Sequence, residues 1–98
     1  MSSLTGKVAI ITGAGSGMGR ATALLMARRG AKVTVAARNA KRNAEVVALI
    51  NDQGGEAIAQ RCDVTVEADV AAMVRKTVDA FGRLDILHNN AALLSRTV

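Results

Sequence analysis

The sequence has almost no aromatic residues, and this limits the partners it can have. Phe81 is the only aromatic residue among 98, and tryptophan, tyrosine and proline are absent. Single-stranded nucleic acids are held by aromatic side chains on which bases stack, beside a groove of positive charge. The net charge of +5 comes from 13 lysines and arginines that never form a run of five, so the positive charge is spread along the chain. We therefore predict no nucleic-acid partner.

Cysteine, histidine and long apolar segments are also scarce. Cys62 and His88 are each the only residue of their type, which excludes an internal disulfide and predicts no metal site. No apolar run approaches the roughly 18–20 residues of a membrane-spanning helix, and the N-terminus lacks the apolar segment of a secretory signal. These absences predict a cytoplasmic protein with no membrane partner.

What the chain does contain is a regular alternation of short β-branched runs and longer helical periodicities. Strands are expected at 7–12, 32–37, 56–61 and 84–88, with helices from 18 to 29, from a cap at Asn39 to Gly54-Gly55, and from a cap at Thr65 to Gly82. The order β-α-β-α-β-α-β is typical of α/β proteins. It predicts part of a Rossmann-type doubly wound parallel sheet, with strand order 3-2-1-4, formed by residues 1–98 as one domain or part of one.

The spacing of apolar residues also predicts which face each helix turns towards the sheet. In the first helix this face carries Met18, Ala21 and Leu25, and in the second it carries Ala44, Val47 and Ile50. In the third helix the residues are Val70, Met73, Val74, Thr77 and Phe81.

A glycine-rich turn between the first strand and the first helix is the most informative segment. Four glycines at alternate positions remove side chains that would hold a ligand away from the backbone, and the unpaired N–H groups of the following helix form an anion site. We predict that a dinucleotide pyrophosphate binds here, on Thr12, Gly13, Gly15, Ser16, Gly17, Met18 and Gly19. The alternative is a flexible glycine-rich loop, which explains the composition but not the position between a buried strand and an amphipathic helix.

Here the chain resembles a known family. Thr12, Gly13, Gly17 and Gly19 form the pattern T-G-x-x-x-G-x-G, the cofactor motif of the short-chain dehydrogenase/reductase family. Asp63-Val64 after the third strand, Asp85, and Asn89-Asn90-Ala91-Ala92 after the fourth strand are similar to further family positions, although Ala92 stands where the family usually has glycine. The resemblance implies cofactor contacts from Asp63, Val64, Asn90, Ala91 and Ala92, and it covers essentially the whole chain.

The end of the second strand bears on which dinucleotide binds. An acidic residue there accepts hydrogen bonds from a ribose 2′-hydroxyl and repels a 2′-phosphate, whereas this chain has Ala37 followed by Arg38. A guanidinium suits a phosphate, and Lys41 and Arg42 add positive charge nearby. The alternative is that Arg38 is a solvated strand-end residue, and the basic residue that NADP-preferring relatives often carry at the position of Ser16 is missing. We predict NADP, with NAD as the less favoured cofactor.

The resemblance also implies catalytic residues that this sequence does not contain. In the family a tyrosine, a lysine four positions later, a serine and an asparagine act beyond the N-N-A-G turn, whereas the chain has no tyrosine. We assign no catalytic residue, and we interpret Cys62 and His88 as packed residues and Ser95 as not activated.

Two hypotheses follow. In the first, the chain is the N-terminal cofactor-binding portion of an oxidoreductase that interconverts an alcohol and a ketone, as a homo-oligomer at full length, and is inactive without the catalytic half. In the second, it is a complete, non-catalytic nucleotide-binding or association module. The absence of a stop signal near Val98 and an uncovered fourth strand favour the first.

Overall fold

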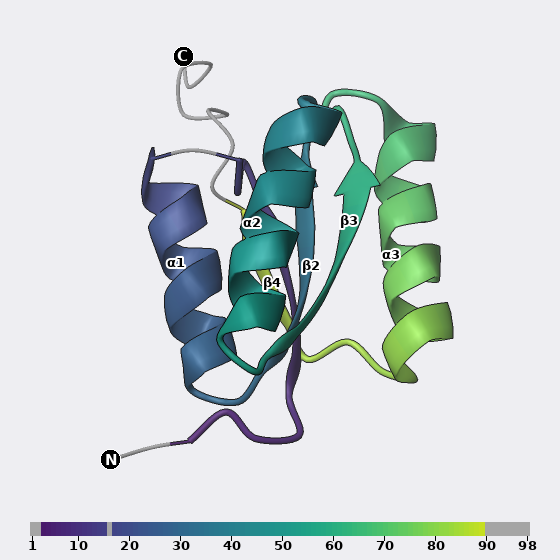
Figure 1. Cartoon of the computed structure of the whole chain (residues 1–98). Coiled ribbons are helices and arrows are strands. Elements are labelled where there is room, and N and C mark those ends of the chain that lie inside the picture. Colours follow the sequence, from purple (N-terminus) through teal and green to yellow (C-terminus); the bar gives the residue numbers. More distant parts are fainter. Residues whose placement is uncertain (1–2, 16, 90–98) are drawn as a thin grey trace.

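A computed structural model describes residues 3–15 and 17–89 of the chain. Strands and helices alternate as predicted (Figure 1). The strands are β1 (Val8–Thr12), β2 (Lys32–Ala37), β3 (Glu56–Arg61) and β4 (Ile86–Asn89), and the helices are α1 (Gly17–Arg28), α2 (Ala40–Asp52) and α3 (Glu67–Phe81). No helix within the described ranges is both long and apolar enough to cross a membrane.

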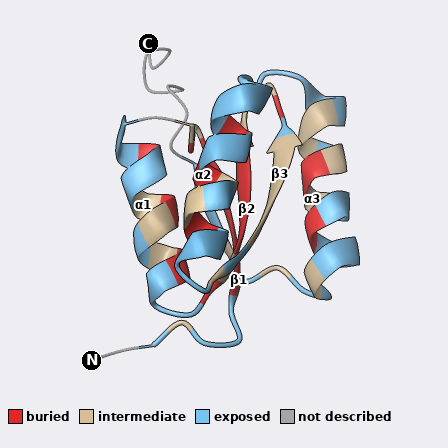
Figure 2. Ribbon diagram, viewed as in Figure 1, coloured by how far each residue is buried: buried red, intermediate tan, exposed pale blue. Residues whose placement is uncertain are grey.

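The four strands form one parallel sheet in the order β3-β2-β1-β4, which confirms the predicted topology. Helices α1 and α2 cover one face of the sheet and α3 covers the other (Figure 1). All five residues of β1 are buried (Figure 2). A strand that lies between two others and is covered on both faces favours a nearly continuous apolar run, and this is why Val8–Ile11 are all apolar and do not alternate with polar residues.

Helix α1 turns a different face towards the sheet from the one predicted. Its buried residues are Gly19, Ala23 and Ala27, while Met18 is 77% exposed and Leu25 is 46% exposed. The prediction was wrong because it followed the largest apolar side chains. Where a helix lies close against a sheet, the face in contact with the sheet carries small residues, because small side chains let the two backbones approach.

The register of α2 is also different from the prediction. Asn43, Val46 and Ile50 are its buried residues, whereas Ala44 is exposed and Val47 is half-buried. Only Ile50 was placed correctly as a fully buried residue. The helix begins after Asn39, whose side chain accepts a hydrogen bond from the Arg42 N–H at 3.0 Å, as predicted for an N-cap.

The predicted face of α3 is confirmed, but its predicted cap is wrong. Met73 and Thr77 are buried, and the other three residues of the predicted face are half-buried. The N-cap position is Val66, which makes no side-chain capping bond. Thr65 instead donates both its N–H and its hydroxyl to Asp63 Oδ1, because an aspartate can bond the backbone two residues later and so competes for this turn.

Asp85 ties the start of β4 to the start of β1. Its Oδ2 accepts a hydrogen bond from the Val8 N–H at 2.9 Å, and its Oδ1 accepts bonds from Arg83 Nη2 at 2.8 Å and Nε at 3.2 Å. The bonds from Arg83 and then the Val8 N–H hold the pKa of the Asp85 carboxyl below its usual range. The folded pKa therefore lies below the unfolded one. The stability that Asp85 contributes is present above about pH 4 and is lost as pH falls through the folded pKa.

We expect Asp85→Asn to flatten the acid limb of the stability profile. The free energy of unfolding, measured by urea titration in steps from pH 7 to pH 2, should fall less steeply on acidification than in the wild type. Asp79→Asn is the control, because Asp79 is an exposed carboxylate near the end of α3 with no hydrogen-bond partner among the described residues. A wild-type profile in Asp85→Asn would contradict the assigned bonds.

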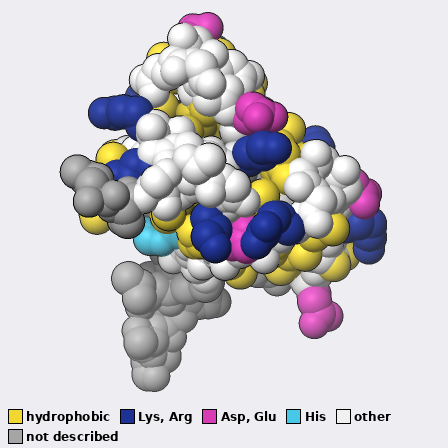
Figure 3. Space-filling view, turned by 90° about the horizontal axis from the view of Figure 1, so that it is seen from below, with side chains coloured by type: hydrophobic (Ala, Val, Ile, Leu, Met, Phe, Trp, Pro, Cys, Tyr) yellow, Lys and Arg dark blue, Asp and Glu magenta, His cyan; other side chains and the backbone are white. Residues whose placement is uncertain are grey.

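Charged side chains at the amino ends of the strands are mixed in sign. Figure 3 shows this end of the molecule, where lysines and arginines are separated by acidic and other side chains and form no continuous positive patch. One contributor is the ion pair between Lys32 and Glu56, with 3.9 Å between Nζ and Oε1. The cations Arg38, Lys41 and Arg42 lie at the opposite end, after the carboxyl end of β2.

Candidate functional site

The carboxyl ends of the strands bring most of the described predicted site residues to one edge of the sheet. Thr12 at the end of β1 pairs with Ala36 of β2 on one side and with Asn89 of β4 on the other. The chain leaves β1 towards β2 and returns to β4 from the far side of the sheet, so the strand order reverses between β1 and β4. In open α/β sheets such a reversal leaves a crevice at the carboxyl ends of the strands, where ligands bind.

Thr12 and Asn89 are joined directly across this crevice. The Thr12 hydroxyl donates to Asn89 Oδ1 at 2.9 Å, and the His88 carbonyl oxygen lies 3.4 Å from the same hydroxyl. Thr12 is 2% exposed, so its hydroxyl is part of the floor of the site. This hydrogen bond links the ends of β1 and β4 below the glycine turn.

The glycine turn adopts conformations that favour glycine. Gly13 has φ of 65° and Gly17 has φ of 60°, a region that other residues enter at a cost. The Ala14 N–H points back to the Ala36 carbonyl oxygen, 3.5 Å away, which holds the turn against β2. Helix α1 begins at Gly17 and buries Gly19 against the sheet. The first N–H groups of a helix have no partner within the helix and carry the positive end of its dipole, and this geometry fits a diphosphate.

Gly15 packs against the first turn of α2 and the end of β2. A Cβ added to Gly15 would lie 3.1 Å from Arg42 Cβ, 3.7 Å from Ala37 Cβ and 3.8 Å from Asn43 Oδ1. The first turn of α2 is therefore a wall of the site, directly beside the glycine turn. The sequence-based prediction treated Lys41 and Arg42 alike and placed no residue of α2 in contact with this turn.

Asn43 is a buried polar residue beside the glycine turn that the sequence reasoning missed. It is completely buried, and its Nδ2 donates to the Ala37 carbonyl at 3.0 Å and the Gln60 carbonyl at 3.4 Å. These two acceptors fix the orientation of the amide, so Oδ1 must face Gly15, where it has no hydrogen-bond partner. A buried acceptor without a donor costs about 1–3 kcal/mol. The sequence feature that could have indicated its burial is the helical spacing of Asn43 with Val46 and Ile50, which places the three on one face of α2.

Asp63 lies just after the end of β3, close enough to Arg38 at the end of β2 for the charge of Arg38 to act on its carboxyl. The hydrogen bonds that Asp63 Oδ1 accepts from the Thr65 hydroxyl at 2.6 Å and from the Thr65 N–H at 2.9 Å hold the pKa of this carboxyl below its usual range, and the charges of Arg38 and Arg61 act in the same direction. Asp63 is therefore ionised at neutral pH. Its Oδ2 makes no hydrogen bond within the described part of the chain and is available as an acceptor, for example for an amino group.

The remaining predicted residues divide into three groups. Val64 packs its side chain into the cluster below α3, which leaves its main chain as the part that a ligand could meet. Met18 projects into solvent from the first turn of α1. Ser16, Asn90, Ala91 and Ala92 lie outside the described residues.

Cys62 and His88 behave as ordinary residues of the fold. Cys62 is buried, and burial together with Asp69 and Asp63 raises the pKa of its thiol, so it stays protonated. His88 is a half-buried residue of β4. Within residues 3–15 and 17–89, no group of three or more histidine, cysteine, aspartate or glutamate side chains could hold a metal ion.

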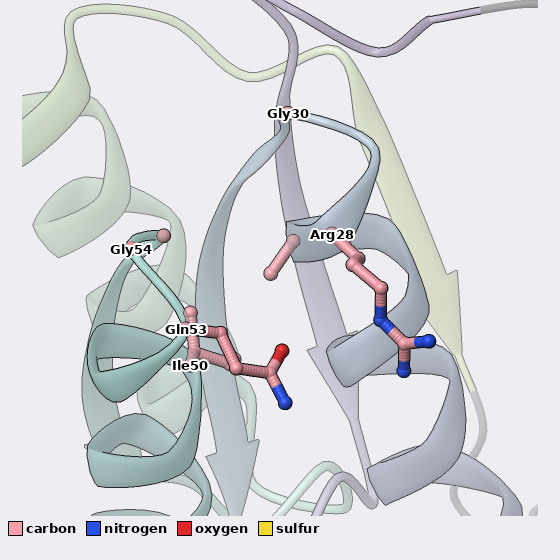
Figure 4. Close-up of a pocket in the computed structure, with 7 residues that line it drawn as sticks. Arg28, Gly30, Ile50, Gln53 and Gly54 are labelled. Atoms are coloured by element: carbon pink, nitrogen blue, oxygen red, sulfur yellow. The ribbon is translucent and has the colours of Figure 1, made fainter.

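A hollow of about 220 Å³ lies elsewhere, between the carboxyl ends of α1 and α2 (Figure 4). It is lined by Ala27, Arg28, Gly30, Ile50, Gln53, Gly54 and Gly55. Gly55 immediately precedes β3 and Gly30 lies two residues before β2, so this hollow is at the end of the sheet opposite the glycine turn. None of the predicted site residues contributes to it.

Comparison with known proteins agrees with this geometry. The profile of the short chain dehydrogenase family matches residues 7–98. The chain is 52% identical over 92 residues to short chain dehydrogenase/reductase astE of Aspergillus oryzae, covering 93% of this chain and 35% of that protein. It is 46% identical over 88 residues to 7alpha-hydroxysteroid dehydrogenase of Escherichia coli, covering 90% of this chain and 34% of that protein.

Solved structures give the same result. A crystal structure of hydroxysteroid dehydrogenase from Escherichia coli superposes with a TM-score of 0.88 at 44% identity, covering 89% of this chain and 37% of that one. Glucose dehydrogenase of Caenorhabditis elegans in its apo form superposes with a TM-score of 0.85 at 43% identity, covering 91% and 39%. The chain thus spans little more than a third of the length of these relatives.

Proposed function

The chain belongs to the short chain dehydrogenase family, and from this premise we propose that it binds NADP(H) as the cofactor-binding portion of an oxidoreductase that interconverts an alcohol and a ketone. The observation that carries the proposal is the glycine turn at the point where the strand order reverses. Gly13 and Gly17 hold the left-handed conformations that such a turn needs, and the N-terminus of α1 follows at once. A diphosphate is the group that this arrangement accommodates.

The residues present fit a nicotinamide dinucleotide. The glycine turn and the start of α1 would hold the pyrophosphate, Asp63 would accept a bond from the adenine, and Arg38 would lie beside the ribose that carries the 2′-phosphate. When bound, the nicotinamide ring would donate a hydride to a ketone or accept one from an alcohol. The described residues would bind and orient the cofactor. The proton transfer to or from the substrate oxygen needs residues that these 98 do not include.

The choice of NADP rests on Arg38. It is an exposed residue directly after β2, where an acidic residue would favour NAD. We expect Arg38→Asp in the full-length protein to weaken NADPH binding by about 10- to 100-fold, which corresponds to the loss of a charge-assisted hydrogen bond. NADH binding should stay the same or improve. Calorimetric Kd values for the two cofactors measure this preference.

The control for that experiment is Arg75→Asp, which makes the same change of charge on the exposed face of α3, away from the site. It should leave the ratio of the two Kd values within about twofold of the wild type. A wild-type ratio of the NADPH and NADH Kd values in Arg38→Asp would contradict the assignment of NADP.

The second candidate function is a nucleotide-binding or association module without catalysis, which would use the same glycine turn. Under the first candidate, the catalytic tyrosine, lysine, serine and asparagine belong to a further part of the protein. These 98 residues alone then do not catalyse oxidation of an alcohol or reduction of a ketone. Reduction of NADP⁺ by the full-length protein with a panel of secondary alcohols separates the two. Turnover supports the oxidoreductase, and cofactor binding without turnover with any alcohol or ketone supports the module.

A further inference from the structure

Strand β3 is an outer strand of the sheet, and one of its two edges is open. It pairs with β2 and with no other strand in the described part of the chain. The Cys62 N–H donates to the Ala37 carbonyl oxygen of β2 at 3.0 Å, and the backbone groups of successive residues alternate between the two edges of a strand. The groups that face the open edge, where a further strand could pair with them, are therefore the N–H and C=O groups of Ala57, Ala59 and Arg61.

Side chains of the chain itself bond two of these three outward carbonyl oxygens. Lys76 reaches over from α3, and its Nζ donates to the Ala59 carbonyl oxygen at 2.9 Å. Gln60 Nε2 donates to the Arg61 carbonyl oxygen at 3.3 Å. The bond from Lys76 is the shorter of the two and has a charged donor, which makes it the stronger one. It also lies at the middle of the open edge, because Ala59 is the central residue of the three.

The partner that would pair with this edge is β3 of a second copy of the chain. Two β3 strands related by a twofold axis can pair antiparallel, with Ala59 opposite Ala59 of the other copy and Ala57 opposite Arg61. This pairing uses the Ala59 carbonyl oxygen that Lys76 bonds. It would also bring the two Lys76 ammonium groups close to the twofold axis, where like charges repel each other and both lose water.

We propose that Lys76 protects the open edge of β3 and prevents it from pairing with β3 of a second copy. The charged residues of the strand itself are its first and last, Glu56 and Arg61, and the four residues between them are uncharged. An uncharged edge is a template for pairing with another chain, and a lysine placed on it is one way in which proteins block that pairing. Lys76 thus places a charge where the strand has none. This role does not depend on the dinucleotide.

The test is Lys76→Ala against Arg75→Ala in the full-length protein. Both variants remove one exposed positive charge from α3, and both introduce a good helix former. Sedimentation measures the protein concentration at which half of the wild-type assembly associates into a particle of twice its mass. We expect Lys76→Ala to lower this concentration by about 10- to 100-fold. Arg75→Ala should change it by less than about threefold, and Lys76→Arg, which keeps the charge, should behave like the wild type.

Hydrogen exchange then locates the contact. In the associated Lys76→Ala protein, the amides of Ala57, Ala59 and Arg61 should exchange at least about 10-fold more slowly than in the unassociated protein. Association without this slowing, or equal association of Arg75→Ala, would overturn the proposal, since it would indicate a general effect of lost positive charge. Lys76→Ala that associates no more than the wild type would also overturn it. So would slow exchange of these amides in dilute wild-type protein, because the edge would then be covered already.

Discussion

Gly17→Val should lower the affinity for the dinucleotide by about 100-fold or more, through the backbone and not through a clash. Gly17 has φ of 60°, and a Cβ built on it meets nothing within 4 Å. Valine fits the space but resists this conformation, at a cost of about 1–3 kcal/mol. Relaxing that strain turns the first N–H groups of α1 away from the diphosphate. The loss of two charge-assisted hydrogen bonds is worth about 3–6 kcal/mol, or at least a 100-fold change in Kd.

Gly54→Val is the matched control for this change. Gly54 has φ of 87° and equally open surroundings, but it lies beyond the end of α2, at the opposite end of the sheet. Both variants should lose a similar free energy of unfolding in urea, and only Gly17→Val should lose affinity for NADPH in calorimetry. Wild-type affinity in a Gly17→Val protein that is as destabilised as Gly54→Val would show that the glycine turn is not the binding element.

Asn43→Asp should destabilise the fold by about 3–5 kcal/mol at pH 7, whereas Ala44→Asp should cost less than about 1 kcal/mol. Asn43 Nδ2 donates to the carbonyl oxygens of Ala37 and Gln60. A carboxylate at this completely buried position would lose both bonds and place a negative charge against two oxygen atoms that also carry partial negative charge. Ala44 is the next residue and is exposed, so its substitution places the same charge in water.

Urea unfolding of the two variants measures the difference and also tests the register of α2. The spacing of apolar residues predicts that Ala44 faces inwards, in which case Ala44→Asp would be the damaging change. The structure assigns that position to Asn43. Greater destabilisation by Ala44→Asp than by Asn43→Asp would contradict the observed register, and with it the wall beside Gly15.

The order of the strands and the glycine turn were predictable because their signals are local. A continuous apolar strand, a glycine turn and a helix are neighbours in the sequence, and right-handed crossovers then allow few topologies. The strand order β3-β2-β1-β4 and the end of β1 at Thr12 agree with that reasoning. Arg38 and Asp63 follow the ends of adjacent strands, so their proximity also follows from the topology.

The helix faces were not predictable in the same way, because they depend on the shape of the partner surface. Hydrophobicity predicts that Met18 and Leu25 of α1 face the sheet. The residues that are buried against it are instead Gly19, Ala23 and Ala27, which are spaced four residues apart. In α2 a polar residue takes an inward position because the ends of two strands offer it carbonyl acceptors. The sequence does not show that those acceptors will be there, and a lone asparagine is normally assigned to the surface.

The hydrogen bond between Thr12 and Asn89 has a consequence for how the protein folds. The two residues are 77 positions apart, while β1 finds β2 after a single intervening helix. At a synthesis rate of roughly 5–20 residues per second, β1 waits about 4–15 s on the ribosome for β4 to follow it. Contacts between such distant segments also form late, because closing a long loop costs entropy before any contact offsets it. We therefore expect the central strand to be half-paired through most of folding, and the crevice for the dinucleotide to be completed last.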